Sequence, residues 1–340
     1  METSATKRQT IAEDTMAATE QTYFLHELEL RREHLLSASR TNTAEQSLSS
    51  LLASVDAALS RLQTGTFGIC ETCHDPIEED RLRCNPLLRF CLDHLSGEEQ
   101  RALERDLTLA AHIQRGLLPP TDWSSAGWQA RYHYQPAGLV SGDYCDLIES
   151  DGAFLFLLGD VAGKGVAASM LMSHLHATFR SLAGQQLPLQ RLVELANRLF
   201  CDSTTAGQYA TLVVGRAWPG GRVEYVSAGH LPLLHVSSAG VSSRDATGVP
   251  LGMFCSTSFE VCELALARND TLFLYTDGLT EIFNPAGDEY GMRRVESLAK
   301  RHAASRPEEL LAACLAEMNS FSGGSKQKDD LTLLALRRVD

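Results

Sequence analysis

The chain has 340 residues, 44% of them hydrophobic, and a formal net charge of -13. At roughly 150 residues per domain, this length predicts about two domains with ordinary apolar cores. The acidic balance argues against sequence-independent nucleic-acid binding, which depends on Lys and Arg neutralising phosphates. The sequence contains no run of about 18 apolar residues, and Met1–Thr10 are polar. We therefore expect a cytoplasmic protein without a membrane span.

The first part of the chain is predicted to be a helical hairpin. Residues 1–20 are polar, and we expect them to be disordered. A helical pattern starts at about Gln21, breaks at residues 39–42 and resumes at Thr43. In the second helix, apolar residues recur in steps of four and three, as in a coiled-coil seam. These residues are Leu48, Leu52, Val55, Leu59 and Leu62.

A cysteine cluster follows the hairpin. Cys70 and Cys73 are separated by two residues, and so are Cys91 and His94. Two such pairs, closed by a loop, supply four ligands for tetrahedral zinc, and a site with four protein ligands is structural. Cys84 lies between the pairs and is a spare or substitute ligand in place of His94. The other cysteines are scattered, which favours reduced thiols over a disulfide framework.

The character of the chain changes after Pro119 and Pro120. A third helix is predicted from about Gly97 to Leu118, and the two prolines end it. Beyond them, short apolar runs predict strands and longer amphipathic stretches predict helices. The strands outnumber the helices and occur in adjacent pairs, which favours an α+β fold with antiparallel sheets and outer helices. The predicted strands are residues 153–158, 210–214, 222–226, 233–236, 271–275 and 331–336, and the predicted helices are 166–182, 189–200 and 307–318.

Acidic residues occur at the ends of several apolar runs. Asp143, Asp160 and Asp277 each adjoin a glycine, and Asp329 precedes the last strand. Carboxylates avoid low-dielectric surroundings unless they are paired or bound to metal. Several aspartates with few soft ligands nearby suit hard cations such as Mg²⁺ or Mn²⁺. Spacing alone does not distinguish these four from Asp245 or Asp288, since an Asp-Gly pair is most often a turn.

Two other phosphate-binding patterns do not fit. Residues 159–165 resemble a P-loop, but the spacing is one residue short and Gly165 replaces the Ser or Thr that binds Mg²⁺. Cys262 and Arg268 have the spacing of a cysteine phosphatase loop, but no glycine lies between them to cradle phosphate. His230 follows Ala228-Gly229 in a predicted turn, where either a role near the substrate or a turn hydrogen bond is compatible with the sequence.

A series of motifs in fixed order along the chain indicates which aspartates belong to the metal site. Residues 110–338 resemble the SpoIIE/RsbU branch of the metal-dependent protein phosphatases, a phosphatase-2C-like group. The resemblance implies an antiparallel β-sandwich flanked by helices and hydrolysis of phosphoserine or phosphothreonine by a metal-activated water. The matching motifs are residues 110–119, 141–146, 159–165, 227–230, 248–252, 276–281 and 329–333.

The same resemblance assigns roles to individual residues. Asp143 and Asp160 would bridge or flank two Mn²⁺ or Mg²⁺ ions, and the Val161 carbonyl would coordinate one of them. Asp277 and Asp329 would hold the second ion. Two further aspartates, Asp146 and Asp330, would support these ligands or substitute for them. The implied substrate is a phosphorylated STAS-type protein, an antagonist of an anti-sigma factor.

The cysteine cluster and its hairpin resemble the DksA/TraR zinc-finger family, in residues 65–73, 81–86 and 91–94. Two features depart from that family: His94 stands where the fourth cysteine is usual, and the turn at residues 39–43 lacks acidic residues. An RNA-polymerase-binding regulator is therefore the alternative function rather than the main one.

These observations predict four segments. Residues 1–20 form the disordered start, 21–96 the hairpin and zinc finger, 97–119 a coupling helix, and 120–340 the phosphatase domain. We expect the hairpin and zinc finger to regulate the enzyme through the coupling helix, within a homodimer, and without nucleic-acid or membrane partners.

Overall fold

The computed structural model describes residues 22–37, 45–95, 97–150, 152–205, 207–324 and 327–340. The predicted disordered start and the hairpin turn at residues 39–43 lie outside these ranges. The chain divides into two units, Met1–Arg105 and Asp106–Asp340. The helix α4, Gly97–Leu117, contains the division and corresponds to the predicted third helix. Within the described residues, every helix is too short or too polar to cross a bilayer.

The N-terminal unit contains two helices and a compact cysteine-rich segment. A helix over residues 22–37 packs against α2, Glu45–Thr64. Leu28, Val55 and Ala58 are fully buried between them, as burial of one apolar stripe per helix requires. Arg32 and Asp56 form an ion pair of 2.6 Å across the two helices. The short helix α3, Glu79–Cys84, and the 3-10 turn η1, Leu92–His94, lie in the cysteine-rich segment.

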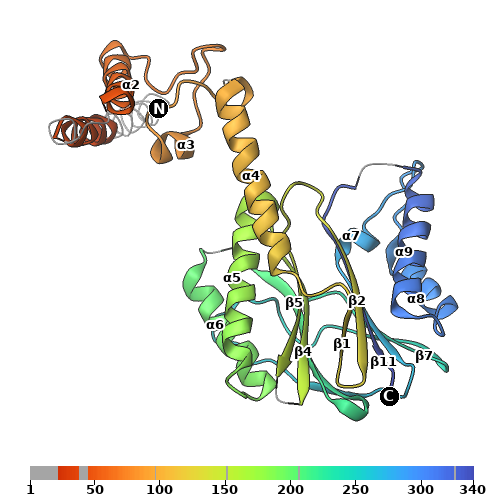
Figure 1. The fold of residues 1–340 in the computed structure, drawn as a ribbon. Coiled ribbons are helices and arrows are strands. Elements are labelled where there is room, and N and C mark those ends of the chain that lie inside the picture. Colours follow the sequence, from red (N-terminus) through yellow and green to blue (C-terminus); the bar gives the residue numbers. More distant parts are fainter. Residues whose placement is uncertain (1–21, 38–44, 96, 151, 206, 325–326) are drawn as a thin grey trace, which may run out of the picture. The chain divides into compact units, whose positions relative to one another are not determined.

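The C-terminal unit is a sandwich of two antiparallel sheets (Figure 1). One sheet has the strand order β1-β2-β11-β10-β7-β8 and the other β3-β4-β5-β6-β9. The strands of the first are β1, Trp123–Ser125; β2, Trp128–Gln135; β7, Leu233–Ser237; β8, Gly240–Arg244; β10, Thr271–Tyr275; and β11, Leu331–Arg338. Those of the second are β3, Asp143–Ser150; β4, Ala153–Val161; β5, Ala210–Ala217; β6, Arg222–Ala228; and β9, Cys262–Ala265.

Strand β4 shows how the layers are held together. Phe154, Phe156 and Leu158 point between the two sheets, whereas Leu155 and Leu157 point to the opposite face. All five are fully buried, so the prediction of a strand buried on both faces is confirmed. This alternation is the period-two pattern of a strand that lies inside a layered fold.

Helices cover both outer faces of the sandwich (Figure 1). Helices α5, Gly165–Ala183, and α6, Leu189–Ser203, pack on the five-stranded sheet. Helices α8, Gly291–Arg301, and α9, Pro307–Ser322, pack on the six-stranded sheet. The expected flanked antiparallel sandwich is therefore confirmed.

One cysteine expectation is wrong. The structure bonds Cys201, at the end of α6, to Cys255 in the loop after β8, with their Cα atoms 5.7 Å apart. Asn197 fixes that loop by accepting a hydrogen bond from Gly252 N and donating one to Phe254 O. The two cysteines are 54 residues apart in sequence, so only the folded loop brings them together.

Candidate active site

Two acidic residues meet at one end of the five-stranded sheet. Asp143 is the first residue of β3, and Asp160 is the penultimate residue of β4. Because β3 and β4 are antiparallel neighbours, the start of one lies beside the end of the other, and Asp143 pairs with Asp160 in register. Between them, Gly142 leaves room: a Cβ on it would lie 3.0 Å from Val161 O and 3.3 Å from Asp160 Oδ1.

The six-stranded sheet contributes a second acidic pair by the same geometry. Strand β10 ends at Tyr275, which pairs with Leu333 near the start of β11. Asp277, the first residue of the short helix α7, Asp277–Thr280, and Asp329 therefore leave the sheet at the same end. A Cβ on Gly278 would overlap the backbone carbonyl of Asp330, so this glycine permits the close approach of the two segments.

The carboxylate of Asp143 joins the two sheets. Its Oδ2 accepts hydrogen bonds from Thr276 Oγ1, at 3.0 Å, and from Thr332 Oγ1, at 2.5 Å. Asp143 is only 1% exposed. Among the residues that the structure describes, its other oxygen, Oδ1, is buried without a hydrogen-bond partner. A buried carboxylate oxygen left in this state is costly unless a cation or a proton compensates it.

Asp330 organises the loop that leads into β3. Its two carboxylate oxygens accept hydrogen bonds of 2.8 Å from the backbone N–H groups of Ala137 and Gly142. The carboxylate is 7% exposed and fully used by these contacts on both oxygens. In this position Asp330 fixes the backbone next to Asp143, and both of its carboxylate oxygens are engaged by backbone N–H groups.

Helix α4 holds the same loop from its other side. Gln114 is buried, donates from Nε2 to Ser141 O at 2.7 Å and accepts at Oε1 from Ser141 N at 3.0 Å. Ser141 Oγ in turn accepts a hydrogen bond from Asp143 N. A chain of hydrogen bonds therefore runs from α4 to the backbone of Asp143.

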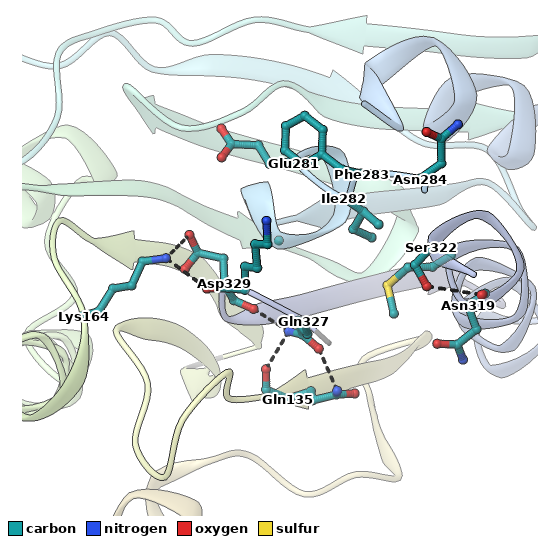
Figure 2. Close-up of a pocket in the computed structure, with 13 residues that line it drawn as sticks. Gln135, Lys164, Glu281, Ile282, Phe283, Asn284, Asn319, Ser322, Gln327 and Asp329 are labelled. Atoms are coloured by element: carbon teal, nitrogen blue, oxygen red, sulfur yellow. Dashed lines mark hydrogen bonds and ion pairs between the residues drawn. The ribbon is translucent and has the colours of Figure 1, made fainter. Parts of the chain in front are cut away.

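A more open group of ligands lies beside these buried residues. One oxygen from each of Asp277, Glu281 and Asp329 lies within 4.8 Å of the others. Sequence reasoning missed Glu281 as a ligand, although it directly follows α7 and its spacing of four from Asp277 brings the two side chains to the same side of one helical turn. Lys164, at the start of α5, donates to Asp329 Oδ2 at 2.8 Å and to Lys328 O at 3.1 Å (Figure 2).

Crowding of these carboxylates raises their pKa values. Burial, followed by the negative charge of Asp160, raises the pKa of Asp143 well above its ordinary value. Burial and the charges of Asp277 and Asp329 raise the pKa of Asp160 to about 7. Burial and the charge of Asp329 raise the pKa of Asp277 to about 6. Without a compensating cation, the site therefore holds protons that an ordinary aspartate would release.

The donor set fits divalent metal ions of the hard class. The candidate ligand atoms are oxygens. The carboxylates of Asp277, Glu281 and Asp329 lie together, the charges of Asp277 and Asp329 act on Asp160, and that of Asp160 acts on Asp143. The Val161 carbonyl lies beside Gly142. The buried, unpartnered Oδ1 of Asp143 and the raised pKa values each indicate missing positive charge. Mg²⁺ and Mn²⁺ take such oxygen ligands.

Asp146 has different contacts from the other predicted residues. It is fully buried on the face of β3 that meets α5, where Arg180 donates to both of its oxygens at 2.7 and 2.9 Å. A two-pronged guanidinium contact of this kind satisfies a buried carboxylate. Asp146 thus attaches α5 to β3, and the structure does not bring it to the acidic cluster.

His230 is buried and forms hydrogen bonds to other strands, not the turn hydrogen bond that was one interpretation of its sequence context. Its Nε2 lies 3.2 Å from Tyr275 O and its Nδ1 lies 2.9 Å from Thr211 Oγ1. Burial lowers the pKa of His230 to about 4, so the ring is neutral. Nε2–H therefore donates to Tyr275 O, and Nδ1 accepts from Thr211. The ring links β5 to the end of β10, one residue before Thr276.

The N-terminal unit brings the four predicted zinc ligands together. One atom from each of Cys70, Cys73, Cys91 and His94 lies within 4.8 Å of the others. The 3-10 turn η1 returns His94 to Cys91, with 3.3 Å between Nδ1 and Sγ. Cys84 is exposed and outside this group. The geometry therefore favours His94 over Cys84 as the fourth ligand.

Backbone groups prepare the cluster for metal. Burial opposes ionisation of Cys70, but hydrogen bonds from the backbone of Cys73, Cys91 and Thr72 outweigh it and lower its pKa to about 6. A backbone hydrogen bond from Asp75 lowers the pKa of Cys73, but burial and the Cys70 and Cys91 thiols outweigh it and raise this pKa to about 12. The metal-free cluster therefore favours one thiolate, that of Cys70, and zinc binding would displace the protons of the other thiols.

Comparisons with known proteins identify two domains in the chain. The family model described as Stage II sporulation protein E (SpoIIE) matches residues 150–339, more than half of the chain. A model described as prokaryotic dksA/traR C4-type zinc finger matches residues 65–93. The chain belongs to the SpoIIE family, and it combines a phosphatase domain of the PP2C type with an N-terminal zinc finger of the dksA/traR type.

Individual relatives extend this result. The chain is 28% identical over 264 residues to Protein IcfG of Synechocystis sp.. The matched region covers 68% of this chain and 41% of IcfG. This chain thus spans about two fifths of the length of IcfG. It is 24% identical over 247 residues to Phosphoserine phosphatase RsbU of Bacillus subtilis, covering 70% of this chain and 72% of RsbU. The solved SiaA-PP2C domain of Pseudomonas aeruginosa shares the fold, with a TM-score of 0.61 and 20% identity over 73% of this chain and 100% of that one.

The raised aspartate pKa values predict a pH-dependent stability of the metal-free protein. The folded-state pKa of Asp160, about 7, exceeds its ordinary value of 3.8, so the stability that its proton contributes is present below about pH 4 and is lost as the pH rises through 7. Asp160→Asn removes the charge and keeps the shape. In urea unfolding with EDTA, we expect this variant to raise the free energy of unfolding by roughly 2 kcal/mol at pH 8 and by little at pH 4.

The control is Asp202→Asn, at an exposed position on α6, which should change the stability at neither pH. An Asp160→Asn effect of equal size at both pH values would contradict the electrostatic account.

The zinc geometry predicts different effects for two candidate ligands. Cys84→Ser should retain one zinc per chain, because its thiol lies outside the cluster. His94→Ala should weaken zinc retention by about tenfold or more, because it removes one of four ligands. Competition with a chromogenic chelator measures both. Zinc loss from the Cys84 variant and retention by the His94 variant would reverse the assignment.

Proposed function

We propose that this protein hydrolyses phosphoserine or phosphothreonine in a regulatory protein, using water activated by two Mn²⁺ or Mg²⁺ ions. The observation that carries the proposal is the meeting of aspartates from both sheets at one end of the sandwich. Asp143 accepts hydrogen bonds from Thr276 and Thr332 of the other sheet, and the charges of Asp277 and Asp329 act on Asp160. Among the described residues, the buried Oδ1 of Asp143 has no hydrogen-bond partner. Membership of the SpoIIE family supports it.

The chain's residues have separate roles in this proposal. Asp143 and Asp160 would hold the ions, the Val161 carbonyl would be a ligand of one of them, and Asp277 and Asp329 would hold the second. We add Glu281 to the second ion, because its carboxylate lies with these two. Asp330 keeps the loop before β3 in place through Ala137 and Gly142.

Phosphate-monoester hydrolysis is among the slowest uncatalysed reactions, so it needs an activated nucleophile and compensation of charge. Bound divalent ions supply a water of lowered pKa and positive charge for the phosphoryl oxygens. The protein's part is to fix the ligand oxygens. Hydrogen bonds from Thr276 and Thr332 hold the Asp143 carboxylate beside the other acidic residues. Lys164 supplies a positive charge next to Asp329, at the solvent-accessible side of the site.

The substrate we propose is a phosphorylated STAS-type protein, as the SpoIIE/RsbU resemblance implies. RsbU and the related RsbP of Bacillus subtilis are both named phosphoserine phosphatases. A protein substrate and a cytoplasmic location fit this assignment. Phosphoserine or phosphothreonine must reach the metal centre from the open side, where Asp329 and Glu281 are accessible.

We also propose that the N-terminal zinc-finger module regulates the site through α4. The helix starts three residues after His94 and ends in the phosphatase unit, where Gln114 holds Ser141. Leu109 and Ile113, one turn apart on α4, are 57% and 58% exposed. Exposed apolar residues at helical spacing are typical of a helix that pairs with another, so a homodimer formed through α4 is the arrangement we favour.

The metal assignment predicts the effect of Asp277→Ala. With Mn²⁺ and a generic aryl phosphate, this variant should lose about 100-fold or more in kcat/KM, because one ion loses a ligand. The wild type should lose its activity in EDTA and regain it with Mn²⁺. Asp288→Ala, in the turn after α7, is the matched control and should retain activity. An Asp277 variant as active as the control would refute the site.

The loop contact predicts the effect of Gln114→Leu. This change keeps the size of the side chain but leaves both Ser141 backbone groups unpaired. We expect about a tenfold loss of kcat/KM on the aryl phosphate and a higher Mn²⁺ concentration for half-maximal activity. His112→Leu, exposed on the same helix, is the control and should behave as the wild type.

Unchanged activity and Mn²⁺ dependence in the Gln114 variant would show that α4 does not control the loop beside Asp143.

A further inference from the structure

A pocket of about 400 Å³ adjoins the metal-ligand cluster (Figure 2). Its walls come from the segment after α7, the end of α9 and the segment before β11. The volume lies within the range of roughly 300–1,000 Å³ that is usual for ligand sites. The pocket extends beyond the candidate metal ligands, so hydrolysis of the phosphate alone does not require it.

The pocket is continuous with the acidic cluster. Glu281 and Asp329 belong to the cluster and also line the pocket, and Lys164 lines it beside Asp329 (Figure 2). A substrate whose phosphate lies at the cluster must therefore place neighbouring atoms at the mouth of this pocket. For a phosphoprotein, those atoms belong to residues that flank the phosphoserine.

The lining of the pocket combines positive charge with apolar surface. Lys164 contacts Asp329 and the Lys328 carbonyl, so positive charge lies next to the cluster, where a phosphate needs it. Ile282, Phe283 and Met318 supply apolar surface. Met318 is 7% exposed, whereas the Phe283 ring is 45% exposed. An exposed aromatic ring beside a reaction centre offers apolar area to a partner at little conformational cost.

The polar side chains of one wall are already paired with each other. Gln135 Nε2 donates to Gln327 Oε1 at 2.6 Å, and Gln327 Nε2 donates to Gln135 O and Asp329 O (Figure 2). Ser322 Oγ likewise donates to Asn319 O at 3.2 Å. These groups build a fixed wall. The surface left for a ligand includes Ile282, Phe283 and Met318, with the exposed Asn319 side chain at its edge.

From these contacts we infer that the pocket is a specificity subsite that takes an apolar side chain of the protein substrate, close to its phosphoserine. The inference rests on the proposed phosphatase function and adds the class of residue that the enzyme selects. The phosphate lies at the acidic cluster beside Lys164, and a side chain such as Leu, Ile or Met enters against Phe283 and Met318. A substrate with glycine at that position leaves this apolar surface in water.

Phosphopeptides test the inference against a substrate without flanking residues. The full chain, with Mn²⁺, is assayed on p-nitrophenyl phosphate and on phosphoserine peptides that carry Leu, Gln, Asp or Gly at each of the two positions on either side. We expect one position at which Leu raises kcat/KM about tenfold over Gly, a size typical of a filled apolar pocket. The rate on p-nitrophenyl phosphate, which has no flanking residues, should not reflect this preference.

Two variants locate the preference in the pocket. Asn319→Trp places a ring in the pocket from an exposed position on α9, and Phe283→Ala removes the exposed wall. Each should abolish the preference for Leu while changing kcat/KM for p-nitrophenyl phosphate by less than about twofold. Ser320→Trp, exposed on the same helix, and Phe254→Ala, 58% exposed outside the pocket, are the controls and should keep it.

The outcomes separate this inference from the proposed function. Turnover of p-nitrophenyl phosphate without any preference for Leu would overturn the subsite and leave the phosphatase standing. A preference that survives in Asn319→Trp and Phe283→Ala, or an equal loss on all substrates, would also overturn it. If the wild type does not hydrolyse p-nitrophenyl phosphate with Mn²⁺, the proposed function fails and the subsite fails with it.

Discussion

The hydrogen bonds of the buried Asp143 carboxylate hold the two sheets together at the active-site end of the sandwich. Asp143 starts β3 in one sheet and accepts hydrogen bonds from Thr276 and Thr332 in the other, so it fixes the two sheets at the point where the remaining acidic residues emerge. Burying a charge without compensation is unfavourable, and the raised pKa of Asp143 reflects this. Two bound cations would satisfy the same groups, which couples metal binding to the packing of the sheets.

The surroundings of Asp143 also explain how a distant segment can affect chemistry. Asp330 and Gln114 hold the loop before β3 from opposite sides through backbone hydrogen bonds. A shift of α4 by a fraction of a helical turn would break the Gln114 contacts and release the loop. Lys164 pairs with Asp329 at the open side and supplies a cation next to the substrate pocket. In the proposed function, regulation, metal binding and substrate selection would all depend on these few neighbouring segments.

The sequence predicted the parts of the fold that carry strong local patterns. β4 and β10 are continuous apolar runs, and their positions were predicted closely. β2 and β3 were not, because their polar and acidic residues interrupt the apolar pattern: β3 holds Asp143 and Asp146 among buried neighbours. The α8 helix was missed although its buried Val295, Leu298 and Ala299 follow a helical period. The disulfide between Cys201 and Cys255 depends on a loop position that no local pattern encodes.

At the site, the family motifs selected Asp143, Asp160, Asp277 and Asp329, and the structure brings them to one end of the sandwich. The motifs left open whether Asp146 supports these ligands or substitutes for one, and they gave no sign of its contact with Arg180, which depends on the pleat of β3. The most direct test is a crystal structure with Mn²⁺, recorded at the manganese absorption edge. The account predicts anomalous peaks within about 2.1 Å of carboxylate oxygens of Asp160, Asp277 and Asp329. Manganese bound elsewhere, or its absence from these aspartates, would contradict it.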